Sequence, residues 1–195
     1  VSLDPTQAQN KSQLRRLGVS MGFDSRYALM DYTARGPREN YSDRYEGSFF
    51  GHYVKRVDSN LTHYARTQTC GNRMGLRDLR LTDAEGNGVH IATEGQVEFS
   101  VLPYDDHDLM NVEHDWELAP SKFNTAHFDF FQQGVGSGSC GPALTLDKYK
   151  VPTDKVVSYT LRFSGLGKLY TGISNRPFVQ EPVLRVNSAP GAETA

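Results

Sequence analysis

Short runs of alternating apolar and polar residues recur along most of this chain, with turn-forming residues between them. One run places Val97, Phe99 and Val101 at alternate positions, with Glu98 and Ser100 on the other face. A period of two is the geometry of a strand, and many strand-length runs between turn signals are typical of all-β domains. The pattern predicts an antiparallel β-sandwich. We expect strands at residues 17–23, 28–33, 48–54, 76–81, 89–93, 96–102, 125–132 and 156–163.

Two shorter signals complete the expected secondary structure. Residues 105–110 begin with carboxylates that can accept hydrogen bonds from the free amides of a helix start, so they predict one short helix. Residues 83–88 predict a hairpin connection, in which Gly86 and Gly88 can adopt left-handed backbone conformations.

The pattern also suggests where the domain begins and ends. At 195 residues, the chain is most simply one domain with a substantial core. We assign that domain to residues 14–166. Residues 1–13 are polar and unpatterned, which indicates a linker or an artificial end. Residues 167–195 contain glycines and prolines that interrupt regular structure, which indicates an irregular tail.

Charge and composition exclude some classes of partner. The formal net charge is −2 and there is no basic run, so we expect no nucleic-acid partner. No apolar stretch approaches the roughly 20 residues that a membrane helix needs, so we expect no membrane partner. The two cysteines, Cys70 and Cys140, are too few for a disulfide framework and lack the spacing of metal ligands.

A dense polar turn at residues 36–44 interrupts the strand pattern. It starts with Gly-Pro, a strong turn former, and continues with two acids, two arginines, an amide and a phenol. Such a segment is too polar for a core. We favour a structural ion-pair corner made by Glu39, Asp43, Arg44 and the more distant Arg73. A role in ligand binding or in an interface is the alternative.

The histidines do not form a recognisable metal site. The nearest pattern is His107 and His114, but they lie seven residues apart across the expected end of the helix. We therefore expect a solvated surface there, and neither a metal nor a cofactor in this chain. The acids that accompany these two histidines are Asp105, Asp106, Asp108 and Asp115. The remaining histidines lie along the expected strands and are expected to pack: His52, His63, His90 and His127.

A second, glycine-rich turn occupies residues 134–142. It neither opens a helix nor contains a lysine, so it does not fit a phosphate-binding loop. Its glycines suit a tightly folded loop held close to another surface. A nucleophilic role for Cys140 is not favoured, because no His and Asp follow the order of a catalytic triad around it.

Four segments, taken in order, resemble a known family. They read GPRENYSDR at residues 36–44, GNR at 71–73, LTDAEGNG at 81–88 and GVGSGSCGP at 134–142. Together they resemble the carboxy-terminal small-chain domain of the large β-galactosidases of glycoside hydrolase family 2, over roughly residues 14–166. The resemblance implies a β-sandwich that forms part of a larger supersandwich, of the kind shared with galactose mutarotases.

The resemblance also implies a division of labour. In that family both catalytic glutamates lie in an upstream barrel domain, and no acid here stands in the context of a catalytic pair. We therefore expect a non-catalytic C-terminal domain that buttresses the barrel and is inactive alone. The implied partners are the barrel of the same polypeptide and a β-galactoside substrate. A homo-oligomer and a divalent or monovalent metal ion in the parent enzyme stay open, and the parent's compartment cannot be read from this chain.

The resemblance assigns a substrate role to the glycine-rich turn. In the resembling enzymes this loop reaches toward the mouth of the active site, and the residue before Gly-Pro lies beside the sugar. By position that residue is Cys140, so Gly138, Ser139 and Cys140 are the expected substrate-binding residues. Some members carry Trp there, which offers a stacking face. A thiol offers only a small apolar contact, so we expect a weaker or differently shaped sugar platform.

Two other functions are compatible with a β-sandwich of this size. A free-standing mutarotase-like aldose epimerase would need a His/Glu acid–base pair in a concave sheet. A carbohydrate-binding module would need exposed aromatic residues lined up on one face. Trp116 is the only tryptophan, and it lies beside the acidic helix rather than in an aromatic row, which counts against the module.

Overall fold

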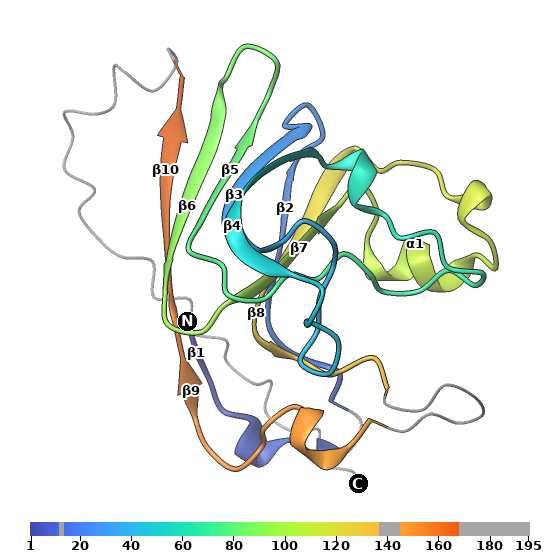
Figure 1. Ribbon diagram of the computed structural model, residues 1–195, viewed down its shortest axis with the longest axis vertical. Helices are drawn as coiled ribbons and strands as arrows, with labels where there is room; N and C mark the ends of the chain where they lie inside the picture. The colour runs from blue at the N-terminus through green and yellow to red at the C-terminus, as the bar shows by residue number, and fades with distance from the viewer. Residues whose placement is uncertain (12–13, 137–144, 168–195) are drawn as a thin grey trace, which may run out of the picture.

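Two antiparallel sheets form the body of the protein in the computed structural model, which describes residues 1–11, 14–136 and 145–167 (Figure 1). The five-stranded sheet has the order β10 (Thr160–Leu166), β6 (Gly88–Glu94), β5 (Asp78–Thr82), β3 (Leu29–Gly36), β4 (Phe49–Arg56). The three-stranded sheet has the order β2 (Arg16–Asp24), β8 (Phe123–Gln132), β7 (Glu98–Leu102). A two-stranded ribbon pairs β1 (Ser2–Leu3) with β9 (Val157–Ser158). The predicted sandwich-like β fold is confirmed.

The main apolar core contains side chains from both larger sheets. In β3, alternate residues Met30, Tyr32 and Ala34 are fully buried, as a period of two requires. The rings of Tyr32 and Phe99 meet edge to face with centroids 5.2 Å apart, which joins the two sheets. Apolar burial of this kind provides the main driving force for the fold.

Each of the eight expected strands is present, with ends shifted by a few residues. The last expected strand, 156–163, is divided into β9 and β10 at Tyr159. The side chain of Tyr159 is buried, and its hydroxyl donates to the carbonyl of Phe128 at 2.6 Å. The strand changes partner at this residue, because β9 pairs with β1 whereas β10 pairs with β6.

β7 departs from the alternation that the sequence suggests. All five of its residues are buried, including Glu98, which the pattern assigned to a polar face. Burial of every residue means that both faces of β7 are covered. Both of its edges are also hydrogen-bonded, one to β8 and the other to Arg73. A strand enclosed on both faces loses the contrast between inside and outside.

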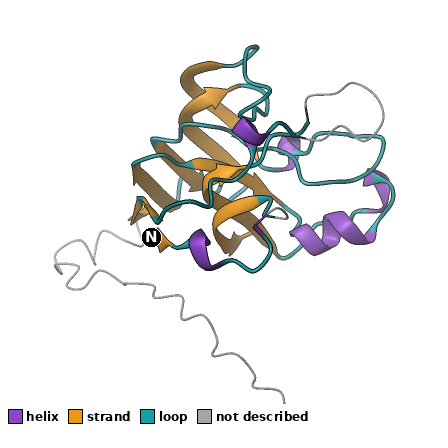
Figure 2. Cartoon of the chain, turned by 90° about the horizontal axis from the view of Figure 1, so that it is seen from below, coloured by secondary structure: helices purple, strands orange, loops and turns teal. Residues whose placement is uncertain are grey.

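The expected helix is present as α1 (Asp106–Asn111). Its start is a capping box: Asp105 accepts from the Asp108 amide at 2.8 Å, and Asp108 accepts from the Asp105 amide at 3.0 Å. The 3₁₀ turns are η1 (Pro5–Gln7), η3 (Asp58–Asn60), η4 (Asp115–Glu117) and η5 (Asp147–Tyr149). These helical segments lie around the margin of the strands (Figure 2). No helix in the described part of the chain is long and apolar enough to cross a membrane.

The expected hairpin between β5 and β6 is confirmed, with one difference. Gly86 has a positive φ of 81°, as expected for the turn. Gly88 does not have a positive φ. It lies so close to the neighbouring strand that a Cβ atom would stand 1.9 Å from the Leu81 carbonyl oxygen. Glycine is needed there for space rather than for a left-handed backbone.

The first residues belong to the fold, contrary to the expected linker at residues 1–13. Ser2 and Leu3 pair with β9, Pro5 is buried, and the amino group of Val1 donates to the Tyr159 carbonyl at 2.8 Å. The unpatterned sequence concealed this because a strand of two residues has no periodicity to detect. Residues 168–195, nearly all of the expected tail, lie outside the described residues.

Candidate functional site

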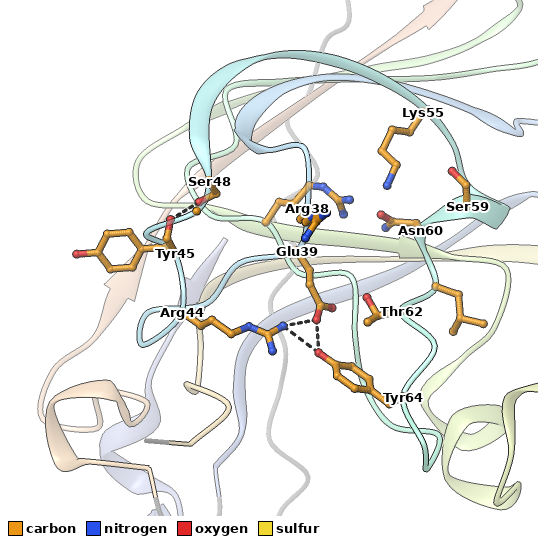
Figure 3. Close-up of a pocket in the computed structure, with 13 residues that line it drawn as sticks. Arg38, Glu39, Arg44, Tyr45, Ser48, Lys55, Ser59, Asn60, Thr62 and Tyr64 are labelled. Carbon is orange, nitrogen blue, oxygen red and sulfur yellow. Dashed lines mark hydrogen bonds and ion pairs between the residues drawn. The ribbon is translucent and has the colours of Figure 1, made fainter. Parts of the chain in front are cut away.

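Glu39 lies at the centre of the corner formed by residues 36–44 (Figure 3). Its carboxylate forms an ion pair with Arg44 and accepts a hydrogen bond from the Tyr64 hydroxyl. It also accepts from the amide of Gly71 at 2.7 Å and from the Tyr41 hydroxyl at 3.2 Å. The Glu39 side chain is only 7% exposed, so these four donors replace water.

Burial and hydrogen bonding set the protonation of Glu39 and Tyr64 in opposite ways. Burial opposes ionisation of Glu39, but hydrogen bonds from Tyr64 and Gly71 outweigh it and lower the pKa of Glu39 below its usual value. Burial raises the pKa of Tyr64 to about 12. At neutral pH, Glu39 is therefore an anion and Tyr64 a donor, which is a stable arrangement rather than a proton-transferring one.

Arg73 does not join an acid at this corner, contrary to expectation. It is 1% exposed and donates to the Tyr32 hydroxyl at 2.8 Å, the Gly71 carbonyl at 2.8 Å and the Pro37 carbonyl at 3.1 Å. No ion pair of Arg73 with a described residue is present. A guanidinium has five donors, so carbonyl and phenol oxygens can satisfy it in place of a carboxylate. Arg73 thus fastens the Gly36-Pro37 turn to the core.

Asp43 also differs from the expected ion-pair role. Its carboxylate accepts from the backbone amides of Val135 and Gly136 at 3.0 and 2.8 Å. A Cβ atom on Gly134 would stand 2.5 Å from the Asp43 carboxyl carbon, so a larger residue there would displace this carboxylate. Asp43 therefore fastens the polar corner to the beginning of the glycine-rich turn, 92 residues away.

Thr145, which follows the glycine-rich turn in the sequence, contacts Gly134 at the beginning of that turn. The Thr145 hydroxyl donates to the Gly134 carbonyl at 2.9 Å, and the Gln133 amide donates to that hydroxyl at 3.1 Å. The expected substrate-binding residues between these ends, Gly138, Ser139 and Cys140, lie outside the described residues. Hydrogen bonds thus hold the described residues on both sides of this gap, Gly134 and Thr145, against each other.

A pocket of about 550 Å³ opens beside the corner, next to β4 and η3. Five charged residues line it, four of them basic: Arg38, Arg44, Lys55 and Arg73, with Glu39. Sequence reasoning singled out neither Lys55 nor Tyr64, another residue of the lining. Lys55 stands in a strand and Tyr64 in a loop, and no local pattern indicates that they converge.

A buried pair of carboxylates lies between β7 and β8. Glu98 and Asp129 are directly opposite each other in the strand register, and both are 1% exposed. The Asn72 amide donates to Glu98 at 2.8 Å, and the Arg16 guanidinium lies 3.4 Å from Asp129. Burial raises the pKa of Glu98 to about 8 and that of Asp129 to about 7. Because both are enclosed, they cannot flank a sugar bond within this domain.

The histidines form pairs rather than clusters. The four that were expected to pack each face a carboxylate, in the pairs His52–Asp31, His63–Asp115, His90–Asp78 and His127–Asp106. The ring of His114 stacks on Trp116 with centroids 4.1 Å apart. In the described residues, no group of three or more His, Cys, Asp or Glu side chains could hold a metal ion.

Cys70 carries a free thiol in the interior of the domain. Its side chain packs with Leu102 and Leu109, beside α1. Burial raises its pKa to about 11, so the thiol is protonated at neutral pH. Cys70 is therefore part of a small apolar cluster and not a reactive group.

Comparisons with known proteins agree on one family. The family model described as beta-galactosidase small chain matches residues 1–163. The chain is similar to the beta-galactosidase of Halalkalibacterium halodurans, with 28% identity over 148 residues, covering 75% of the chain and 15% of the relative. The beta-galactosidase of Priestia megaterium is 29% identical over 163 residues, covering 84% and 15%. That of Lactococcus lactis subsp. lactis is 30% identical over 123 residues, covering 62% and 12%. The chain thus spans about 15% of the length of the first two of these relatives.

Proposed function

The chain belongs to the beta-galactosidase small-chain family, and on that basis we propose that it is the non-catalytic C-terminal domain of a β-galactosidase that hydrolyses terminal β-D-galactosides. The family match over residues 1–163 carries this proposal. β-Galactosidases are glycoside hydrolases, and this domain accounts for a small share of the relatives' length. In the proposed role it buttresses the catalytic barrel and contributes the turn at residues 134–142 to the substrate pocket.

The chemistry of the carboxylates supports a non-catalytic role. A retaining glycosidase needs one carboxylic acid that donates a proton and one accessible carboxylate that attacks the sugar. Glu39 is an anion at neutral pH, so it cannot donate a proton. It is only 7% exposed and both of its oxygens accept hydrogen bonds, so it is not an accessible nucleophile. Glu98 and Asp129 have raised pKa values but are enclosed in the domain.

The base of the glycine-rich turn supports its proposed role at the substrate. A loop that contacts a ligand from another domain must leave its own domain in a fixed direction. Asp43 provides such a fixed base by holding two consecutive amides, of Val135 and Gly136. Charge-assisted hydrogen bonds to a carboxylate are stronger than neutral ones.

The first test is activity of the 195-residue chain on its own. We expect no release of nitrophenol from an aryl β-galactoside, because the required carboxylate pair is proposed to lie in another domain. Turnover that is lost in Glu39→Gln would contradict the proposal. Faster equilibration of galactose anomers would instead favour the aldose epimerase.

The second test addresses the turn in the β-galactosidase that carries this domain. Asp43→Asn removes the charge that holds the turn. It also places an NH₂ group, which is a donor, against the backbone amides of Val135 and Gly136, which are donors as well. We expect the KM for the galactoside to rise several-fold while the melting temperature changes little. Asp154→Asn is the matched control, because it changes an exposed aspartate that lies outside the corner and outside the glycine-rich turn. Equal KM values for both variants would exclude the turn from substrate binding.

A further inference from the structure

The pocket beside the corner has an excess of positive charge that the described residues do not neutralise. Four cations and one carboxylate line it, and Figure 3 shows three of the cations, Arg38, Arg44 and Lys55, around Glu39. The carboxylate, Glu39, already accepts from Arg44, Tyr64, Gly71 and Tyr41. It therefore compensates Arg44 and leaves the other three cations without a counter-charge in the lining.

These three cations lack acidic partners. The side chains of Arg38 and Lys55 form no hydrogen bond or ion pair with any described residue. Arg73 donates only to uncharged oxygens. Lys55 is half-buried, and burial together with the nearby Arg73 lowers its pKa. Placing like charges together in a partly dry pocket costs free energy unless an anion offsets it.

We propose that this pocket is a binding site for an oxyanion, a phosphate or a carboxylate, held by Lys55 and Arg38, with the buried guanidinium of Arg73 adding positive charge behind them. A guanidinium presents paired donors that match two oxygens of such a group, and an ammonium adds a point charge. The volume of about 550 Å³ leaves room for a group larger than the anion itself. The site goes beyond the proposed function and does not rest on it, since a galactoside is uncharged.

Isothermal titration calorimetry of the 195-residue chain tests the site directly. Sodium phosphate and sodium acetate are the probes, and sodium chloride keeps the ionic strength constant. We expect saturable binding of one anion per chain. Lys55→Gln should weaken it roughly tenfold, the effect of losing one charge-assisted hydrogen bond. Lys122→Gln, which removes an exposed lysine outside the pocket, should leave the affinity unchanged.

Circular dichroism and the melting temperature show whether Lys55→Gln is folded. Arg38→Gln, which alters an exposed side chain, gives a second variant in case the first one misfolds. Tighter binding of phosphate would assign a phosphorylated ligand, and tighter binding of acetate would assign a carboxylate such as an acidic protein side chain. Binding no stronger than that of chloride, or equal affinities in Lys55→Gln and Lys122→Gln, would overturn the proposal.

Discussion

Replacing Glu98 with glutamine should stabilise the protein at neutral pH and have little effect in acid. Glu98 is 1% exposed and accepts a hydrogen bond from the Asn72 amide, which a glutamine oxygen can also accept. The new NH₂ group would lie near the buried side chain of Asn72 and the facing Asp129, whose oxygens receive no hydrogen bond from the described residues. The substitution therefore preserves shape and removes only the ionisable group.

The expected magnitude follows from the pKa of Glu98, which burial raises from 4.5 to about 8. Between these values the native protein holds a proton that the unfolded chain releases. The free energy of unfolding of the wild type therefore decreases as pH rises, by about 1.4 kcal/mol per pH unit. By pH 7 the loss amounts to about 3 kcal/mol, and it is complete above pH 8. Glutamine does not ionise, so the variant avoids this loss.

Urea denaturation at pH 4 to 9 measures the effect as the difference in unfolding free energy between the variant and the wild type. The difference should be near zero at pH 4 and grow to about 3 kcal/mol at pH 7. His127 titrates in both proteins. Asp129 faces Glu98 and contributes to its raised pKa, so the difference reports the titration of this pair of carboxylates. Glu46→Gln, at an exposed position, should show no such trend. A difference between variant and wild type that is independent of pH would refute a protonated Glu98 in the native state.

Three other substitutions or modifications test the described contacts. Arg44→Ala should lower the unfolding free energy by only about 1 kcal/mol, because Arg44 is 49% exposed and Glu39 keeps its other donors; a loss above about 3 kcal/mol would mean that the corner depends on this pair. Gly88→Ala should cost roughly 2 kcal/mol or more in urea denaturation, since its Cβ would overlap a carbonyl, whereas Gly47→Ala, which has open space, should be nearly neutral. Cys70 should resist a thiol reagent until the protein unfolds, as peptide mapping would show, and rapid labelling in the native state would contradict its burial.

The strands could be predicted from the sequence because their side chains alternate. β3 is the clearest case, with buried residues at every second position. Glu98 shows where this reasoning ends: an acid in a strand normally faces solvent, but here the strand is covered on both faces. Whether the second face is covered depends on the packing of other segments, which periodicity does not report.

The corner was located from its motif, but the partners of its residues were not. Asp43 accepts hydrogen bonds from backbone amides of a segment 92 residues away. Every residue except proline has a backbone amide, so a pattern of side chains cannot identify these donors. Arg73 was expected to pair with an acid, but its guanidinium donates to carbonyl and phenol oxygens instead. Lys55 enters the pocket from β4 only because the sheet brings that strand beside the corner. These relations arise from tertiary structure alone.

The contact between Asp43 and the amides after Gly134 bears on how loops can be exchanged between enzymes of this kind. Transplanting residues 134–142 from a relative would transfer the loop without the Asp43 carboxylate that holds its first residues. If the recipient lacked an acid at position 43, or the donor carried a side chain at 134, the graft would have lost its anchor or collided with it. The unit to exchange is therefore the loop together with the corner, two segments that are distant in sequence and act as one part.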